Sequence, residues 1–362
     1  MKVGILTWYN HGNYGSALQA YALQIVLRRM GHDVEVIAYQ MRWIRRSCSF
    51  IKRIKTICKK YLSIYAEHKQ FLKRYQNHFQ YFYYKHISFS RVCDERNIAA
   101  VCRKYDAIIS GSDQIWSPVY LDPVYLLNFC SSQSVRKIAY APSLGQYSIP
   151  QSLQNEYKKL LSDYTAISVR ENIGAEILSK LGFKAKVVAD PTMLLTKNDY
   201  LAIEKKVENL PQSYIFCYVL ETSLSYKDQI KRLSIKLNLP IVGISFNNTD
   251  YKWMQNASNV GPCEFLWLIN HSKFVVTNSF HCTIFSMIFQ KQFLVLERFN
   301  KENPICQNSR MEQLSQTFGI GEHIIKEGDK LPEEINSLIC PYDTIIPSIA
   351  HTSMEYLRLA LS

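Results

Sequence analysis

Three polar side chains in this sequence follow apolar runs, at points where a strand is expected to end and a loop to begin. His281 lies within TNSFHCTIFSMIF, Asp113 follows the run DAIIS, and Arg170 follows the run AISV. An imidazole or a carboxylate can transfer a proton or hydrogen-bond a hydroxyl group. A guanidinium can bind a phosphate or carboxylate through two parallel hydrogen bonds. Side chains of these types could therefore carry out acid–base chemistry on an anionic substrate.

Each of these side chains also has a structural interpretation. A lone histidine is usually structural, Asp113 could cap the turn that follows it, and Arg170 could pair with the adjacent Glu171 or with a neighbouring helix. The position of His281 favours chemistry, because the turn over 278–281 is predicted to present it at the N-terminus of an apolar helix. The apolar helix would then be a rigid support for the histidine.

A fourth candidate is the loop NHGNYG, residues 10–15. Its glycines allow a close approach of the backbone to a ligand, and a helix that starts at Ser16 as its N-cap would offer free N–H groups to an anion. The alternative is a glycine-rich turn without a ligand. The loop lacks the GxGxxG pattern of dinucleotide sites. The ten cysteines show no zinc-site spacing and, without a secretion signal, no disulfide framework, so no metal site is predicted.

The elements that must position these residues alternate between strand and helix along the whole chain, which predicts an α/β fold with parallel sheets. In such sheets, ligands lie at the carboxyl ends of the strands. The length favours two Rossmann-like domains, 1–163 and 164–362, with a cleft between them, and a single barrel is the competing topology. Strands are predicted near residues 3–7, 34–39, 105–110, 138–140, 166–169, 186–188, 214–219, 240–243, 274–277 and 293–296.

The net charge of +13 is concentrated in one stretch. Residues 42–91 hold 13 Lys and Arg against a single acidic residue, Glu67, and their apolar residues have helical spacing. We expect a basic helical insertion in the first domain, either an ordinary docked helix or a cationic surface for an anionic partner. No nucleic-acid module is evident. With neither signal peptide nor membrane span, a cytoplasmic protein is expected, with contact to the inner membrane face as an option.

The ordered set of segments GILTWYNHGNYGSALQAYAL, YDAIISGSDQIW, KIAYAPSLG, ISVRENIGAEIL, VVADPTMLL, VVTNSFHCTIFSMIF and NSRMEQL resembles the polysaccharide pyruvyl transferase family over most of the chain. The resemblance implies two Rossmann-like domains arranged as in GT-B glycosyltransferases, with residues 1–163 on the acceptor side and residues 164–362 on the donor side. It also implies transfer of the enolpyruvyl group of phosphoenolpyruvate to sugar hydroxyls of a cell-surface polysaccharide precursor, such as an exopolysaccharide or capsule, as a ketal. Phosphoenolpyruvate is then a co-substrate, and no cofactor is required.

The resemblance also assigns roles to residues. His281 and Asp113 are expected to be catalytic. Donor binding is expected from Arg170, Ser279, Asn278 and Arg310, and acceptor binding from Asn13, Gly15 and Gln114. The expected partner is a glycan or a lipid-linked oligosaccharide, and the oligomeric state is left open. With such an acceptor, the basic stretch 42–91 would suit an anionic membrane or the diphosphate of a lipid carrier.

The sequence departs from the family at one position. Some members have an arginine two residues before the key histidine, where this chain has Ser279. A cation for the phosphate or carboxylate of the donor is therefore missing, and Arg310 or Lys291 is expected to replace it. Two other functions stay open: a glycosyltransferase with a nucleotide-sugar donor on the same scaffold, and a non-catalytic binding protein of an envelope pathway.

Overall fold

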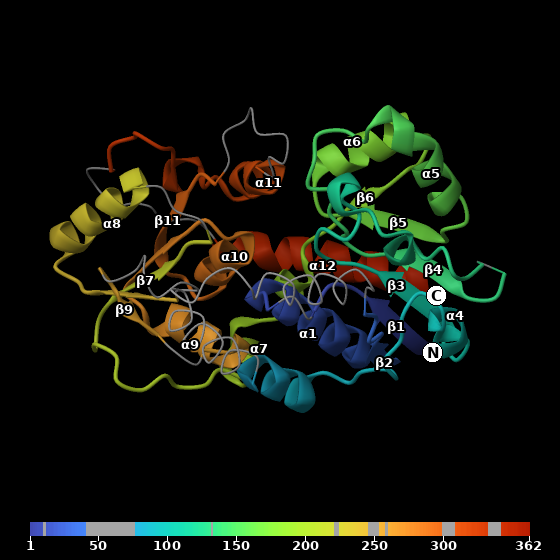
Figure 1. Ribbon diagram of the computed structural model, residues 1–362, viewed down its shortest axis with the longest axis horizontal. Coiled ribbons are helices and arrows are strands. Elements are labelled where there is room, and N and C mark those ends of the chain that lie inside the picture. Colours follow the sequence, from blue (N-terminus) through green and yellow to red (C-terminus); the bar gives the residue numbers. More distant parts are fainter. Residues whose placement is uncertain are drawn as a thin grey trace, which may run out of the picture.

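Two six-stranded sheets, each parallel throughout, form the framework of the computed structural model of this protein (Figure 1). The structure describes residues 1–9, 12–40, 77–131, 133–220, 224–244, 253–257, 260–298, 308–331 and 342–362. Strands alternate with helices, as the sequence predicts. Because the strands are divided between two sheets, the competing barrel topology is wrong.

The first lobe contains the sheet with strand order β2-β1-β3-β4-β5-β6. Its strands are β1 (Lys2–Leu6), β2 (Asp33–Val36), β3 (Ala107–Ser110), β4 (Arg136–Ala139), β5 (Ala166–Val169) and β6 (Lys186–Val187). The helices of this part of the chain are α1 (Tyr14–Arg29), one over 77–86, α4 (Ile98–Cys102), α5 (Gln151–Leu161), α6 (Asn172–Lys180) and the 3₁₀ turns η3 (Pro118–Tyr120), η4 (Pro123–Leu126) and η5 (Pro191–Leu194).

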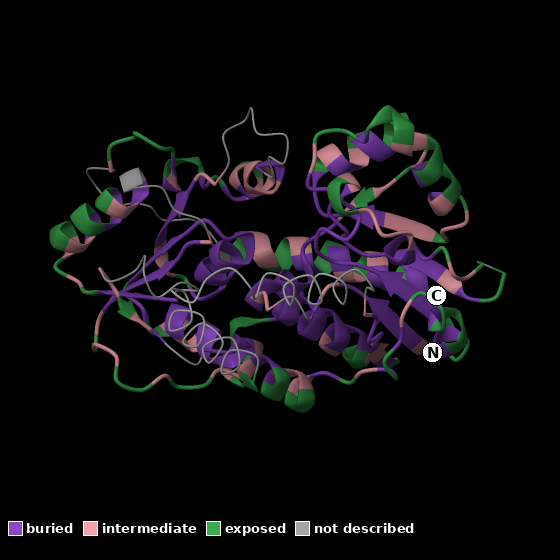
Figure 2. Ribbon diagram, viewed as in Figure 1, coloured by how far each residue is buried: buried purple, intermediate pink, exposed green. Residues whose placement is uncertain are grey.

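The second lobe contains the sheet with strand order β12-β11-β10-β7-β8-β9. Its strands are β7 (Ile215–Tyr218), β8 (Ile241–Gly243), β9 (Gln255–Asn256), β10 (Phe274–Thr277), β11 (Gln292–Leu296) and β12 (Ile324–Ile325). Its helices are α7 (Lys197–Leu201), α8 (Leu224–Leu237), α9 (Pro262–His271), α10 (Phe280–Ile288), α11 (Ser309–Phe318) and the turn η6 (Gly321–His323). Every residue of β10 and of α10 is buried (Figure 2).

The boundary predicted between residues 163 and 164 falls inside the first lobe. Strand β5 pairs with β4, and β6 pairs with β5, so the first sheet continues to Val187. The sequence reveals that these strands exist but not which sheet they join, because pairing is a contact between distant parts of the chain. The structure therefore moves the end of the first sheet beyond the predicted cut.

The last helix, α12 (Tyr342–Leu361), returns to the first lobe and extends across the middle of the molecule in Figure 1. Tyr356 donates a hydrogen bond to the backbone carbonyl of Ala139, and Arg136 donates one to the carbonyl of Leu361. Both partners lie in or beside β4, in the centre of the first sheet. The C-terminal part of α12 consequently belongs with the first lobe, although it was predicted to be part of the second domain. The first turn of α12 contacts the second lobe, where Gln290 donates a hydrogen bond to Asp343.

Helix α1 shows how the local sequence determines where a helix begins and ends. Its N-cap is Asn13, whose side-chain oxygen accepts hydrogen bonds from the N–H groups of Gly15 and Ser16. The helix thus starts before Ser16, and the prediction that Ser16 is the cap is wrong, because Asn13 satisfies the first-turn amides. At the other end, Gly31 has φ +89°, which is the left-handed conformation that commonly follows a helix.

Most of the predicted basic insertion, residues 42–76 of the stretch 42–91, lies outside the described residues. Its described end forms the helix over 77–86, which is docked on the protein. Phe82 in this helix is fully buried, and His78 lies 3.3 Å from Glu264 of α9. In the part of the chain that the structure describes, no helix combines the length and apolarity needed to cross a bilayer.

The two lobes share one continuous core through Tyr14, the first residue of α1. Its fully buried ring stacks on Phe265 of α9 with centroids 4.5 Å apart, and its hydroxyl donates a hydrogen bond to the carbonyl of Val260. A side chain from the first lobe is therefore packed as core of the second. This contact fixes the start of α1 against the second lobe.

We predict that Tyr14→Ala lowers the free energy of unfolding by about 3–5 kcal/mol, because a buried aromatic ring is replaced by a cavity. The matched control Tyr14→Phe keeps the ring and loses one hydrogen bond, which should cost about 1 kcal/mol. Urea denaturation followed by tryptophan fluorescence measures both. Wild-type stability of Tyr14→Ala would contradict the shared core.

Candidate active site

The order of strands reverses once in each sheet, between β1 and β3 and between β7 and β10. Such reversals leave a crevice at the carboxyl ends of the strands. A cavity of about 350 Å³ lies at both of them, with walls from both lobes. It is lined by Trp8, Asn13, Ser16, Asp113, Gln114 and Tyr120 of the first lobe and by Leu220, Asn278, Ser279, Phe280, His281, Arg298 and Arg310 of the second. The strand-to-helix loops meet here, as the sequence analysis expects.

His281 lies in the first turn of α10, which Ser279 caps by accepting a hydrogen bond from the N–H of Cys282. The imidazole is buried and packs against Gly15 of α1: a Cβ atom on Gly15 would lie only 2.0 Å from His281 Nδ1. Only a residue without a side chain fits there. Gly15 does not line the cavity, so its role is to admit the imidazole rather than to approach the acceptor as predicted.

A buried carboxylate of the first lobe, Asp190, faces His281. Its Oδ2 lies 3.4 Å from His281 Nε2 and accepts a 2.7 Å hydrogen bond from Arg170, while its Oδ1 accepts hydrogen bonds from the N–H and hydroxyl of Thr192. Burial raises the pKa of Asp190, but the charges of His281 and Arg170 and these hydrogen bonds outweigh it, and the pKa is well below its usual value. Asp190 is therefore ionised at neutral pH and orients the imidazole.

Asp113 follows β3 on a turn where its own φ is +69°, a conformation that aspartate adopts more readily than most residues. Its Oδ2 accepts a 2.5 Å hydrogen bond from the hydroxyl of Ser16, and its Oδ1 accepts one from the N–H of Gln114. Burial raises the pKa of Asp113, but the charges of His281 and Arg170 lower it further, to below the usual value. Asp113 thus combines turn capping with an ionised carboxylate at the cavity, suited to accept a hydrogen bond from a substrate hydroxyl.

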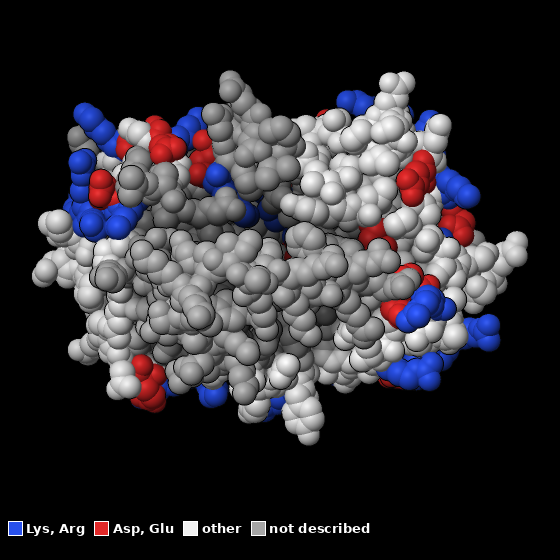
Figure 3. Space-filling model, in the orientation of Figure 1, with Lys and Arg blue, Asp and Glu red and all other residues white. Residues whose placement is uncertain are grey.

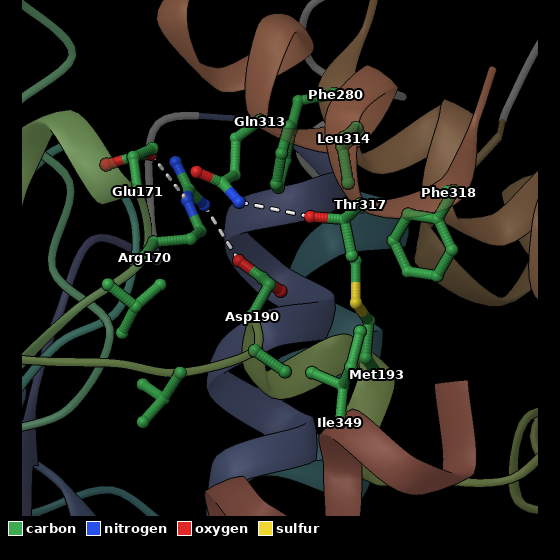
Figure 4. Close-up of a pocket in the computed structure, with 13 residues that line it drawn as sticks. Arg170, Glu171, Asp190, Met193, Phe280, Gln313, Leu314, Thr317, Phe318 and Ile349 are labelled. Atoms are coloured by element: carbon green, nitrogen blue, oxygen red, sulfur yellow. Dashed lines mark hydrogen bonds and ion pairs between the residues drawn. The ribbon is translucent and has the colours of Figure 1, made fainter. Parts of the chain in front are cut away.

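Arg170 does not line this cavity. Its buried guanidinium makes salt bridges of 3.1 Å to Glu171 and 2.7 Å to Asp190, which agrees with the ion-pair interpretation. It packs on the ring of Phe280, 4.3 Å from the ring centroid, and lines a second cavity of about 200 Å³ (Figure 4). Figure 4 shows Arg170 and Asp190 pointing toward each other at one side of that cavity. The guanidinium acts on the main cavity through Asp190 and Phe280.

Two other arginines line the main cavity: Arg298, which follows β11, and Arg310, in the first turn of α11. Basic side chains are visible in the hollow between the lobes in Figure 3. Burial, with a contribution from Arg170, lowers the pKa of Arg310 to about 10, which leaves it charged at neutral pH. Of the two predicted replacements for the cation missing at Ser279, Arg310 reaches the cavity. Lys291 follows the far end of α10 and does not line it.

The predicted acceptor residue Asn13 lines the cavity, but its side-chain oxygen is engaged in capping α1. The N–H groups of Gly15 and Ser16 are therefore already satisfied. The anion site that the sequence analysis considered at the start of this helix is not formed by these amides. Gln114, also predicted for the acceptor, is a buried lining residue beside Gly145.

Two predicted donor residues have structural contacts as well. Asn278 lines the cavity, and its side-chain oxygen accepts a 2.8 Å hydrogen bond from the N–H of Leu220, which joins the ends of β10 and β7. Ser279 lines the cavity and caps α10. Both residues thereby fix the turn that carries His281.

Sequence reasoning missed several residues of this region, among them Asp190, Arg298, Trp8 and Tyr120. Asp190 carried the same signal as Asp113, since it is an acidic residue directly after an apolar run, VVAD. Arg298 could have been found in the same way, because it follows β11 by two residues. The two aromatic residues carried no signal that separates them from core residues.

A family model of polysaccharide pyruvyl transferases matches residues 13–298, which is most of the chain and includes Asp113, Asp190 and His281. The chain belongs to the polysaccharide pyruvyl transferase family. It is accordingly a transferase, and the resemblance seen in the sequence is confirmed. No curated protein sequence matches this pyruvyl transferase family member.

Solved structures show the same fold. The UDP-GlcNAc 2-epimerase of Methanocaldococcus jannaschii superimposes with a TM-score of 0.57 at 11% identity, and each chain is covered over 99% of its length. The UDP-GlcNAc 2-epimerase of Neisseria meningitidis superimposes with a TM-score of 0.52 at 14% identity, over 99% of this chain and 100% of the other. At these identities the likeness concerns the fold alone. The GT-B-like arrangement that was predicted is confirmed.

We predict that Asp190→Asn lowers the free energy of unfolding at pH 7 by about 3–5 kcal/mol, because it removes one of the two carboxylates that pair with the buried Arg170. The native pKa of Asp190 is depressed, so its contribution is complete above the unfolded-state pKa of about 3.9 and is lost as the pH falls below that value. The difference between wild type and variant should therefore shrink as the pH is lowered from 5 to 3.

Urea denaturation of both proteins across this pH range measures that difference. The matched control is Asp33→Asn, since the side chain of Asp33 is 68% exposed in its ion pair with Lys2. An exposed pair contributes about 0–1 kcal/mol, so the control should stay close to wild type. A gap between wild type and Asp190→Asn that is constant down to pH 3 would show that Asp190 is not held ionised.

We also predict that Gly15→Ala lowers kcat by about a hundredfold while the protein stays folded, because the new Cβ displaces the imidazole of His281. Circular dichroism and steady-state kinetics measure the two effects. Gly321→Ala is the matched control, since its Cβ would meet only Ser315 Oγ at 3.6 Å. If Gly15→Ala keeps the wild-type kcat, the position of the ring does not depend on this contact.

Proposed function

We propose that this enzyme transfers the enolpyruvyl group of phosphoenolpyruvate to two hydroxyl groups of a sugar in a cell-surface polysaccharide precursor, as a cyclic ketal. The observation that carries the proposal is that one cavity brings His281 together with the ionised Asp113 and with the cations Arg298 and Arg310. A donor with both a phosphate and a carboxylate needs cations, and guanidinium groups suit both anions. The addition of two hydroxyls needs a group that moves protons.

In this mechanism, His281 gives a proton to C3 of phosphoenolpyruvate, which makes C2 electrophilic. A sugar hydroxyl hydrogen-bonded to Asp113 forms a bond to C2, and its proton restores the imidazolium. The bond between C2 and the phosphate oxygen then breaks, and the second hydroxyl takes the vacated position on C2. Its proton leaves with the phosphate. One hydroxyl proton thus replaces the proton that His281 gave to C3, and the other ends on the phosphate.

The ionised carboxylates have distinct roles in this scheme. Asp190 lies 3.4 Å from His281 Nε2 but does not line the cavity, so it acts as a positioning residue. Asp113 lines the cavity and is ionised, so it accepts a hydrogen bond from the attacking hydroxyl. Arg298 and Arg310 hold the anionic groups of the donor. We place the reaction in the cytoplasm, with a glycan or a lipid-linked oligosaccharide as acceptor.

We predict that the wild type binds phosphoenolpyruvate and that Arg310→Ala weakens this binding at least about tenfold. A hydrogen bond to a charged group contributes about 1.5–3 kcal/mol, and 1.4 kcal/mol corresponds to a factor of ten. Calorimetric titration measures binding. For His281→Ala we expect binding within a few-fold of wild type, and no release of phosphate in the presence of acceptor.

UDP-GlcNAc serves as the comparison ligand in the same titration, because a Methanocaldococcus jannaschii epimerase with this fold was solved with UDP-GlcNAc and UDP. Lys291→Ala is the matched control for Arg310→Ala, since Lys291 is also basic but does not line the cavity. Binding of UDP-GlcNAc without binding of phosphoenolpyruvate would overturn the proposal in favour of a nucleotide-sugar donor.

A further inference from the structure

An aromatic corner, formed by Trp8 and Tyr120, lies on the first-lobe wall of the main cavity. Trp8 follows β1, and Tyr120 is the last residue of η3, which follows the loop that carries Asp113. The two rings meet edge to face, with centroids 6.3 Å apart and planes at 66°. The two rings are therefore differently oriented, and they line the same cavity as the carboxylate of Asp113.

One ring of the aromatic corner packs on the protein core, and the other is partly exposed. Trp8 also packs edge to face on Tyr125, which is buried and in turn packs against Tyr39. Tyr120, by contrast, is 43% exposed although it lines the cavity. The core does not require a large aromatic side chain at this position. A ring held at the rim of an active-site cavity in this way is available to a ligand.

The neighbouring groups on the same wall are polar. Asp113 and Gln114 come from the loop before η3, and Asn13 comes from the loop after β1. In the described part of the structure, the buried Nε2 of Gln114 has no hydrogen-bond partner. Apolar ring faces next to a few hydrogen-bonding groups are the combination that orients a small ligand in a pocket. The basic residues Arg298 and Arg310 belong to the other lobe.

A pyranose ring has the matching chemistry. Its C–H groups form an apolar face that can lie on an aromatic ring, while its hydroxyls project from the edge toward polar groups. A phosphate-bearing donor has no such face and is matched instead by the arginines. The aromatic wall of the first lobe thus suits the sugar, and the basic wall of the second lobe suits the anionic donor.

We infer that the aromatic corner of Trp8 and Tyr120 is the acceptor subsite, which binds a pyranose ring through its C–H face and directs adjacent hydroxyls toward Asp113. This inference rests on the proposed function for the identity of the reaction. It adds that the acceptor is recognised through stacking on these two aromatic side chains.

The test uses methyl glycosides of galactose, glucose, mannose and N-acetylglucosamine as probes, because these lack aromatic aglycones that could stack by themselves. Saturation-transfer NMR and calorimetric titration measure binding to wild type, Tyr120→Ala and Tyr120→Phe. We expect at least one glycoside to bind wild type with saturation transfer strongest at the C–H protons of one ring face. Tyr120→Ala should weaken that binding about tenfold, as truncation of a contact aromatic commonly does, and Tyr120→Phe should stay within about twofold.

Val119→Ala is the matched surface control, because Val119 is in the same turn and is 44% exposed but does not line the cavity. It should bind the glycosides as wild type does. Equal binding by wild type and Tyr120→Ala, or no saturation transfer from any of the four glycosides, would overturn the inference. Circular dichroism verifies that the variants are folded.

A titration of Tyr120→Ala with phosphoenolpyruvate separates this inference from the proposed function. Donor binding should be unchanged, because the arginines are on the other wall. If phosphoenolpyruvate binds but no glycoside does, only the acceptor subsite is wrong. If glycosides bind at the corner but phosphoenolpyruvate does not, the subsite stands and the proposed donor is wrong.

Discussion

The site depends on the ion pairs and hydrogen bonds of one buried carboxylate, that of Asp190. This carboxylate is almost fully buried in the first lobe, and it contacts Arg170 of its own lobe and His281 of the other. A buried ion is tolerated only where partners satisfy it, and here Thr192 occupies the remaining oxygen with two hydrogen bonds. Because the imidazole and its carboxylate come from different lobes, the arrangement exists only when the lobes are packed together.

The packing of the lobes is correspondingly tight around the imidazole. Gly15 leaves room for His281 on one side, and Tyr14, its neighbour in α1, is inserted into the core of the second lobe. Adjacent residues of one helix therefore fix the lobes and shape the site. Arg170 lies outside the main cavity but supports it, since it pairs with Asp190 and packs on Phe280, which lines both cavities.

Much of the fold and part of the site could be predicted from the sequence, for a local reason. Short apolar runs bounded by polar or glycine-containing loops marked the strands, and 166–169 and 274–277 agree with β5 and β10. Residues directly after such runs, such as Asp113 and His281, lie at the carboxyl ends of strands, where the cavity is. The predicted GT-B-like arrangement followed from the family resemblance.

The rest depends on contacts between distant parts of the chain, which local patterns do not carry. The sheet that β5 and β6 join, the docking of α12, and the packing of Gly15 against His281 are of this kind. Asp190 followed the same local rule as Asp113 but was passed over, because its importance comes from the histidine of the other lobe. The membrane role considered for residues 42–91 stays a prediction, since most of that stretch lies outside the described residues.

The return of α12 to the first lobe makes the second lobe an insertion within the first in terms of chain connectivity. Both ends of the polypeptide lie in the same lobe, and N and C are near each other in Figure 1. The first lobe is therefore built from two chain segments that are separated in sequence by the second lobe. A nascent chain that has finished the second sheet still lacks α12, so the contacts of this helix with Arg136 and Ala139 form only after the second lobe has been synthesised.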